Sequence, residues 1–333
     1  MFTRKFKKRS MGKIFLFLVL NILFGFDMPM LGATEDYPTR PINLQIGFPP
    51  GAAAAVSAQI FAEGAKKYLP NPQPMLLIHK PGASGAASAD FVLKQPKDGY
   101  NLMWIANDLI IKLGKEGPLL HFVKEDLIPI GSIVYTPGIL TVNTESPFKT
   151  LEDFVNFAKE HPENLSFGSA GIGGSIHLNM EIFMSRCGIK LNHIPFGGGA
   201  QSMTAVLGGH IDCHLGSISS VGPHIVPGGK LRALAVFARE RLPQIPDVPT
   251  CIERGYNIDR GFWHFLAVAK GTPQPILDIL QKVLNKTADD PQVKESLIRT
   301  GYVPVKLNPE ETTNKINEEF DLAKQVFGKP GLK

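Results

Sequence analysis

Short apolar runs alternate along the chain with segments in which apolar residues recur every three or four positions. Runs rich in β-branched residues predict strands, and the longer periodic segments predict amphipathic helices. The predicted strands are residues 42–46, 75–79, 102–105, 139–142, 191–195, 211–215, 231–237 and 262–268. Because strands and helices alternate, we expect an α/β fold with mostly parallel sheets.

Polar residues mark the starts of two predicted helices. Thr150 and Asp153 form a capping pair ahead of an apolar stripe, and Thr272 followed by Pro273 predicts a cap with proline at the first helical position. Apolar residues recur at helical spacing after Pro273 and again from Ile316 to Phe327. These stripes predict helix faces that pack on the core.

The first 33 residues have the pattern of an export signal. Six Lys and Arg residues precede an apolar run over residues 14–24, and Gly32 and Ala33 follow it. This order is typical of a secretory signal peptide, and the run is shorter than the about 20 residues of a spanning helix. We therefore expect residues 1–33 to direct export and to be removed near Ala33. An uncleaved membrane anchor is the alternative.

The net charge of +5 comes from this first segment. The chain has 35 basic and 30 acidic residues, and removing the six basic residues and the one acid, Asp27, of residues 1–33 leaves 29 of each. Nucleic-acid binding requires a basic face, which a neutral body does not provide by default. We expect no nucleic-acid partner.

The cysteines and histidines do not predict a metal centre. Cys187, Cys213 and Cys251 allow at most one disulfide, and the sequence leaves open whether two of them are bridged. On a strand, His210, Asp212 and His214 would share a face. No other part of the sequence has metal-ligand spacing, however, so we predict no metal and no cofactor.

Glycine clusters occur where predicted strands give way to helices. They are residues 49–51, 81–85, 168–175 and 197–199. Such turns lie at the carboxyl ends of strands in open α/β sheets, where glycine lets a ligand approach the backbone and the next helix presents free N–H groups. Any one cluster could serve only a tight turn. Together they predict a binding site built from backbone amides.

Catalytic motifs are absent from the sequence. Residues 171–176 lack the final glycine of a dinucleotide fingerprint, and Gly229-Lys230 has neither the glycine nor the hydroxyl residue of a P-loop. No Gly-x-Ser-x-Gly elbow occurs. We predict a binding protein and not an enzyme.

A series of short motifs resembles one known family. The motifs include Phe48-Pro49-Pro50-Gly51 and Lys80-Pro81-Gly82-Ala83-Ser84-Gly85, and the others are residues 37–42, 96–100, 167–171, 177–178, 193–198, 207–212, 229–235, 245–250 and 271–273. In this order, over nearly all of the mature chain, they resemble the Bug family. Its members are the periplasmic receptors of tripartite tricarboxylate transporters.

The resemblance implies a type II periplasmic-binding-protein fold, with two α/β lobes joined by two crossing strands. One lobe would comprise residues 34–135 and 262–333, and the other residues 136–261. The protein would be a periplasmic monomer that holds a small carboxylate between the lobes and delivers it to a permease of a large and a small subunit. The alternatives are a sensing module that presents its closed form to a signalling partner and, less favoured, a periplasmic enzyme.

The resemblance also implies which residues contact the ligand. In the first lobe they are Phe48, Pro50, Gly51, Ala52, Ala53, Ala106 and Asn107. In the second lobe they are Ser169, Gly171, Gly173, Ser175, His177, Gly198, Gly216 and Ser217. Ser175 would also be the N-cap of its helix, and a packing or capping role for His177 is an alternative to ligand binding.

The sequence departs from the family pattern at positions that bear on specificity. Residues 52–55 are all alanine where the family usually has glycines followed by Thr-Asp, and Gln59 stands in place of an arginine. Gly216 stands where an acid is usual. The loss of two acids leaves no obvious partner for an ammonium group. We therefore expect the ligand to be a carboxylate without an ammonium group.

Overall fold

The computed structural model describes residues 36–118 and 121–328. Contacts divide the chain into residues 1–37, of which only Asp36 and Tyr37 are described, and residues 38–333, which contain every helix and strand discussed below. The predicted export signal lies outside the described residues. No helix among the described residues is long and apolar enough to cross a membrane.

Three parallel strands form one end of the sheet, with β1 between the other two. They are β1 (Ile42–Ile46), β2 (Met75–His79) and β3 (Asn101–Ala106). The helices that follow them are α2 (Ala53–Ala65), α3 (Ala86–Leu93), which is preceded by the short turn η1 (Ala83–Gly85), and α4 (Asn107–Glu116). Because the strands are parallel, the loops that lead into these helices lie at one edge of the sheet.

Three further parallel strands form the other end of the sheet, in the order β7, β5, β6. They are β5 (Ser166–Ser169), β6 (Asn192–Pro195) and β7 (Cys213–Gly216). Around them lie α5 (Leu151–Glu160), α6 (Ser175–Cys187), α7 (Gly199–Leu207), α8 (Ile218–Val221) and η3 (Gly222–His224). The glycine loops after β5 and β6 therefore share an edge, as the loops after β1 and β2 do.

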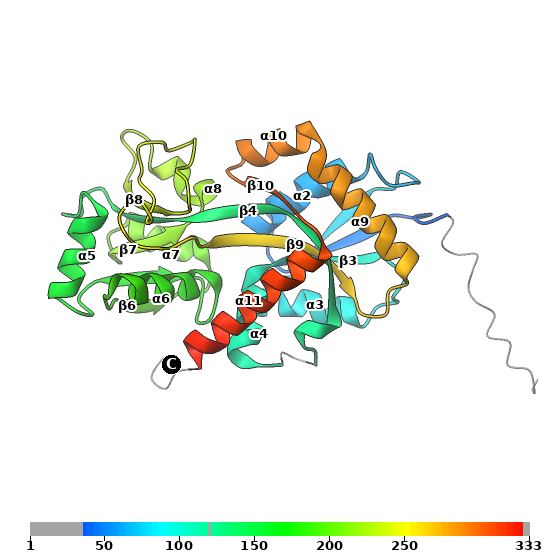
Figure 1. Cartoon of the computed structure of the whole chain (residues 1–333), viewed down its shortest axis with the longest axis horizontal. Helices are drawn as coiled ribbons and strands as arrows, with labels where there is room; N and C mark the ends of the chain where they lie inside the picture. The colour runs from blue at the N-terminus through cyan, green and yellow to red at the C-terminus, as the bar shows by residue number, and fades with distance from the viewer. Residues whose placement is uncertain (1–35, 119–120, 329–333) are drawn as a thin grey trace, which may run out of the picture. The chain divides into compact units, whose positions relative to one another are not determined.

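The long strand β4 (Leu127–Asn143), which follows the short turn η2 (Lys124–Asp126), belongs to both ends of the sheet. Its first part pairs with β9 (Gly261–Ala269) and β10 (Val303–Leu307), and its last part pairs with β7 and β8 (Leu231–Phe237). Figure 1 shows β4 and β9 running side by side between the two groups of strands. The chain thus has the predicted type II periplasmic-binding fold, two lobes joined by crossing strands.

The C-terminal helices complete the first group and reach the second. They are α9 (Gln274–Asp289), α10 (Pro291–Arg299) and α11 (Pro309–Phe327). α11 packs on α4 and β4 and also contacts α6 (Figure 1). The side of α11 that faces them carries the buried residues Ile316, Ala323 and Phe327, which belong to the apolar stripe predicted from the sequence.

The apolar interior divides into clusters along β4. Phe154, Phe183 and Phe237 pack in one cluster at its end, and Phe265 with Ile105 in another near its start. All three cysteines are buried free thiols, and Cys187, Cys213 and Cys251 lie in the first cluster. Burial raises the pKa of Cys187 to about 12, so its thiol is protonated at neutral pH.

Several sequence predictions are confirmed at their stated bounds. The strands β1, β2 and β8 begin and end where the apolar runs do. Thr150 caps α5, because its hydroxyl accepts a hydrogen bond from the Asp153 amide at 3.1 Å. The expectation of mostly parallel sheets holds at the two ends and is wrong around β4, whose pairings are all antiparallel.

Other predictions are wrong in detail. The Thr272 hydroxyl donates to the Ala269 carbonyl and does not cap α9, which begins one residue after Pro273. The strand predicted over residues 211–215 starts only at Cys213, because the Asp212 carboxylate accepts hydrogen bonds from the amide and hydroxyl of Ser166. His210 lies in the preceding turn, so the three polar residues do not share a strand face.

Gly261 provides a test of the crossing of β4 and β9. A Cβ at this position would lie 2.2 Å from the Thr136 carbonyl oxygen, a backbone atom that cannot move aside cheaply. We expect Gly261→Ala to lower the free energy of unfolding by about 1–3 kcal/mol, as overpacking does. The urea midpoint measures this change. Gly199→Ala, where nothing lies within 4 Å of the new Cβ, is the control and should leave the midpoint unchanged or slightly higher. Equal midpoints for both variants would contradict the packing described.

Candidate functional site

The loop after β1 packs directly on the loop after β2. A Cβ on Gly47 would lie 2.3 Å from the Gly85 Cα, so the two backbones touch. The His79 ring donates a hydrogen bond from Nδ1 to the Phe48 carbonyl at 2.9 Å. Pro50 and Gly51 are exposed at the tip of this loop, and Gly51 has a φ of +82°, which favours glycine. The loop is held at its base and open at its tip.

The start of α2 has no side chain that caps it. Ala52 is the N-cap residue and cannot supply an acceptor, and the first turn contains no acid. The first amides of a helix have no partner within the helix, and the helix dipole places positive charge beside them. The amides of Ala53 and the residue after it are therefore suited to bind an anion.

A buried hydrogen-bond network fixes the first two turns of α2. Tyr302 donates from its hydroxyl to the Ala53 carbonyl at 2.6 Å. The Ser57 hydroxyl accepts from Trp104 Nε1 at 2.9 Å and lies 2.9 Å from His264 Nδ1. Burial lowers the pKa of His264 to about 3, so this ring is neutral at physiological pH. The network orients the α2 amides without adding charge.

Asn107 begins α4 at the end of β3, on the same edge as the α2 start. Its side chain is 0% exposed, and neither its amide nitrogen nor its amide oxygen has a partner among the described residues. Phe48 and Ala106, two further predicted contacts, both line a nearby cavity of about 10 Å³, close to the space one water needs. The structure thus brings three of the predicted first-lobe residues to this edge.

Three amides of the corresponding loop in the second lobe are already paired. The Gly171 amide donates to the Ser169 hydroxyl at 3.1 Å, and the Gly173 amide donates to His177 Nδ1 at 3.0 Å. The Ser175 amide and hydroxyl both donate to Asp108 Oδ1, at 3.0 and 2.9 Å. Ser175 is the first residue of α6 and Gly174 its N-cap, so the prediction that Ser175 caps the helix is wrong.

Two stacked histidines hold this loop. The ring centroids of His177 and His193 lie 3.9 Å apart, and His193 Nε2 lies 2.7 Å from the Ser169 hydroxyl. His177 accepts at Nδ1, so its proton is on Nε2, 3.3 Å from Glu181 Oε1. Burial, and the neighbouring His177, lower the pKa of His193 to about 4. Both nitrogens of His177 are thus engaged within the loop and α6.

The remaining predicted residues lie at the ends of β6 and β7. Gly198 is the N-cap of α7, with open space around it, and Gly216 packs against Val221 and Ser220. Ser217 caps α8, and its amide donates to the Ser220 hydroxyl at 3.0 Å. One direct link between the loops of the two lobes is the contact of Asp108 with Ser175.

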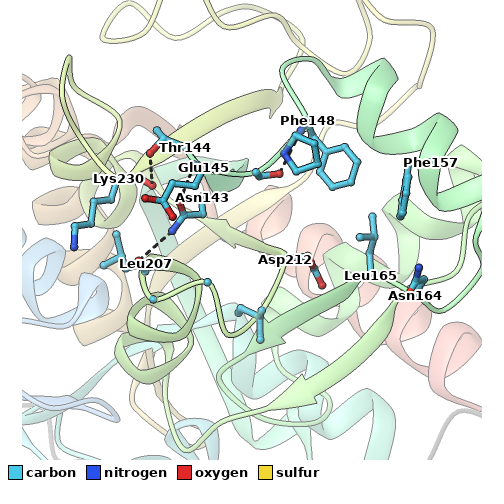
Figure 2. A pocket seen from close by; sticks show the side chains of 15 residues that line it. Asn143, Thr144, Glu145, Phe148, Phe157, Asn164, Leu165, Leu207, Asp212 and Lys230 are labelled. Atoms are coloured by element: carbon cyan, nitrogen blue, oxygen red, sulfur yellow. Dashed lines mark hydrogen bonds between the residues drawn. The ribbon is translucent and has the colours of Figure 1, made fainter.

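A larger cavity of about 670 Å³ lies at the opposite edge of the β5–β7 strands (Figure 2). Asn143 and Asp212, which line it, are already bonded. Asn143 Nδ2 donates to the carbonyls of Val206 and Leu207, and Asp212 accepts from Ser166. The cavity lies at the amino ends of these strands, whereas ligands of open α/β sheets bind at the carboxyl ends, where the glycine loops are. We therefore place the candidate site at the loops.

Comparison with known proteins identifies the family. The sequence profile of the tripartite tricarboxylate transporter family receptors matches residues 57–332. The chain belongs to this receptor family. A Cupriavidus necator protein, described as "UPF0065 protein in gbd 5'region", is 30% identical over 311 residues, with 92% of each chain covered.

Solved structures agree with the family assignment. The periplasmic binding protein BugD is 27% identical with a TM-score of 0.76, and the match covers 89% of this chain and 99% of that one. An R. palustris protein solved with adipate, Rpa4515, is 22% identical with a TM-score of 0.79 over 88% and 99% of the two chains. At that identity the second likeness shows the fold alone.

Sequence reasoning missed Asp108. It directly follows the predicted contacts Ala106 and Asn107 and is the acid in the first turn of α4. Desolvation raises the pKa of Asp108, and the hydrogen bonds from Ser175 oppose this rise. The sequence did show an acid at a helix start, next to two predicted contacts. It did not show what this acid binds, because its partner Ser175 lies 67 residues away in the sequence.

The buried His264 predicts a pH dependence of stability. Its pKa is about 3 in the folded protein and about 6.5 in the unfolded chain, so below pH 6.5 the unfolded chain binds the proton first and stability falls. Between pH 7 and pH 5, His264→Asn should remove up to about 2 kcal/mol of this loss. Urea unfolding at both pH values measures it. His161→Asn, at an exposed position, is the control. The same loss in His264→Asn as in the unaltered protein would contradict the neutral ring.

Proposed function

We propose that this receptor binds a small carboxylate in the cleft between its lobes, in the periplasm, and passes it unchanged to a membrane permease. The observation that supports this proposal most is the start of α2. Its first amides have no capping side chain and follow directly on the exposed tip of the loop after β1. Family membership supports a receptor role. Export by residues 1–33 and the permease are parts of this proposal.

Neutral donors provide enough binding energy for this role. Micromolar affinity corresponds to about −8 kcal/mol. A hydrogen bond to a charged group contributes roughly 1.5–3 kcal/mol, so about four to six of them exceed the cost of ordering the site. The α2 dipole adds about 0.3–1 kcal/mol. No buried arginine is needed.

In this proposal the carboxylate lies against the β1 loop and the start of α2, close to Asn107. Gly51, Ala52 and Ala53 would contact it through the backbone, and the Asn107 amide would gain the partner that it lacks among the described residues. The lobes would divide near residues 135 and 261, where β4 and β9 cross. Residues of the second lobe would close over the rest of the ligand.

The serine–histidine pairs support binding without catalysis. In the described residues these pairs are Ser57–His264, Ser169–His193 and Ser202–His214. The serine of each pair is 0% exposed. A catalytic nucleophile must be accessible to its substrate, and these buried hydroxyls are not accessible. We propose that the pairs have structural roles.

Ala53→Pro tests the α2 amide directly. Proline suits the first position of a helix, and Ala52 already has the extended backbone (φ −66°, ψ 153°) that a following proline requires. The variant removes one N–H and keeps the fold. We expect about ten- to hundredfold weaker carboxylate binding with unchanged stability, measured by calorimetry with hexanoate. Ala53→Gly, which keeps the N–H, is the control, and unchanged affinity in Ala53→Pro would place the carboxylate elsewhere.

Uptake separates transport from signalling. A strain without this protein should lose high-affinity uptake of the carboxylate, because the permease would receive no loaded receptor. Radiolabelled uptake measures this, with Ala53→Gly restoring transport and Ala53→Pro failing to do so at low ligand concentration. Intact uptake together with loss of a transcriptional response to the carboxylate would instead support the sensing module.

A further inference from the structure

A carboxylate of the protein itself already lies at the start of α6. Asp108 Oδ1 accepts hydrogen bonds from the Ser175 amide at 3.0 Å and the Ser175 hydroxyl at 2.9 Å. The same oxygen would lie 3.2 Å from a Cβ on Gly174. These are the distances at which a ligand's carboxylate binds a helix N-terminus. Asp108 comes from the first lobe, so this contact joins the starts of α4 and α6.

Two further amides of the α6 loop are also taken. The Gly171 amide is bonded to the Ser169 hydroxyl and the Gly173 amide to His177. A cation beside this loop, Lys115, already lies near an acid. The Lys115 side chain passes Gly173, where its Cδ would lie 2.5 Å from an added Cβ, and its ammonium group lies 3.9 Å from Glu116. A second anionic group at this loop would meet three amides that are already paired.

The starts of α2 and α6 therefore differ in charge. The start of α2 has no acid in its first turn and no capping side chain. The start of α6 has the Asp108 carboxylate against it, and the titratable groups beside it, His177 and Glu181, are paired with each other. A ligand can bring one carboxylate to α2. A second carboxylate directed toward α6 would meet Asp108, and like charges at such short range repel.

We propose that Asp108 determines specificity, by filling the anion position at the start of α6 so that the receptor selects monocarboxylates over dicarboxylates. This inference rests on the proposed carboxylate-binding function. The ligand would carry one carboxylate for the α2 amides and an uncharged distal end near Asp108. A distal hydroxyl or amide is compatible, because it can donate to the carboxylate. A distal carboxylate is excluded by charge and not by size.

Matched acids of equal length test the proposal. The probes are hexanoate with adipate and butyrate with succinate, measured by calorimetry at pH 7.5. In the unaltered protein we expect the monocarboxylate of at least one pair to bind more than tenfold tighter than its dicarboxylate. Asp108→Asn keeps the shape and an acceptor oxygen and removes the charge. The variant should bind the dicarboxylate more tightly and so reduce the affinity ratio of monocarboxylate to dicarboxylate to about threefold or less. Asp278→Asn, an acid in α9, is the control and should leave the ratio unchanged.

The outcomes separate this inference from the function on which it rests. Tighter binding of the dicarboxylates by the unaltered protein would overturn the role of Asp108 and leave a carboxylate receptor in place. An unchanged ratio in a folded Asp108→Asn would do the same. If Asp108→Asn does not fold, the ratio in the unaltered protein still decides. Failure to bind any of the four acids would count against both this inference and the proposed function.

Discussion

The amides at the start of a helix need acceptors, and this requirement organises the site. The structure meets it differently in its two lobes. In the second lobe the Ser169 hydroxyl, the His177 ring and the Asp108 carboxylate each accept from an amide of the α6 loop. In the first lobe the start of α2 has only alanine at its cap. In the proposed site the ligand's carboxylate would be the acceptor at α2, and the difference between the α2 and α6 starts would orient the ligand.

The scaffold keeps this asymmetry in place. β4 pairs with strands of both lobes and so joins them, and α11 contacts both α4 and α6. The buried hydrogen bonds of Tyr302, Ser57 and His264 hold the first turns of α2 in place with neutral groups. The proposed site involves no buried positive side chain, so attraction for the anion would come from oriented backbone dipoles. A neutral protein body can therefore bind an anion locally.

Much of the fold was predictable from the sequence, because its strands are short apolar runs and glycine follows them. β4 was predicted only over residues 139–142, because Pro129, Gly131, Pro137 and Gly138 interrupt its pattern and produce irregular pairing. β5 has too few apolar residues to be recognised. The pairing of Asp108 with Ser175 could not be predicted, since it depends on how two lobes meet. The family resemblance located the loops, and the structure showed which amides are already paired.

The most direct test of the account is the response of individual backbone amides to ligand. In ¹⁵N-labelled protein titrated with hexanoate, the amide resonances of Gly51, Ala53 and Ala54 should move downfield, as expected for new hydrogen bonds to a carboxylate. Those of Gly171, Gly173 and Ser175 should keep their shifts apart from small effects of closure. Large downfield shifts at Gly171, Gly173 and Ser175 with none at α2 would contradict the account, because they would place the carboxylate in the second lobe.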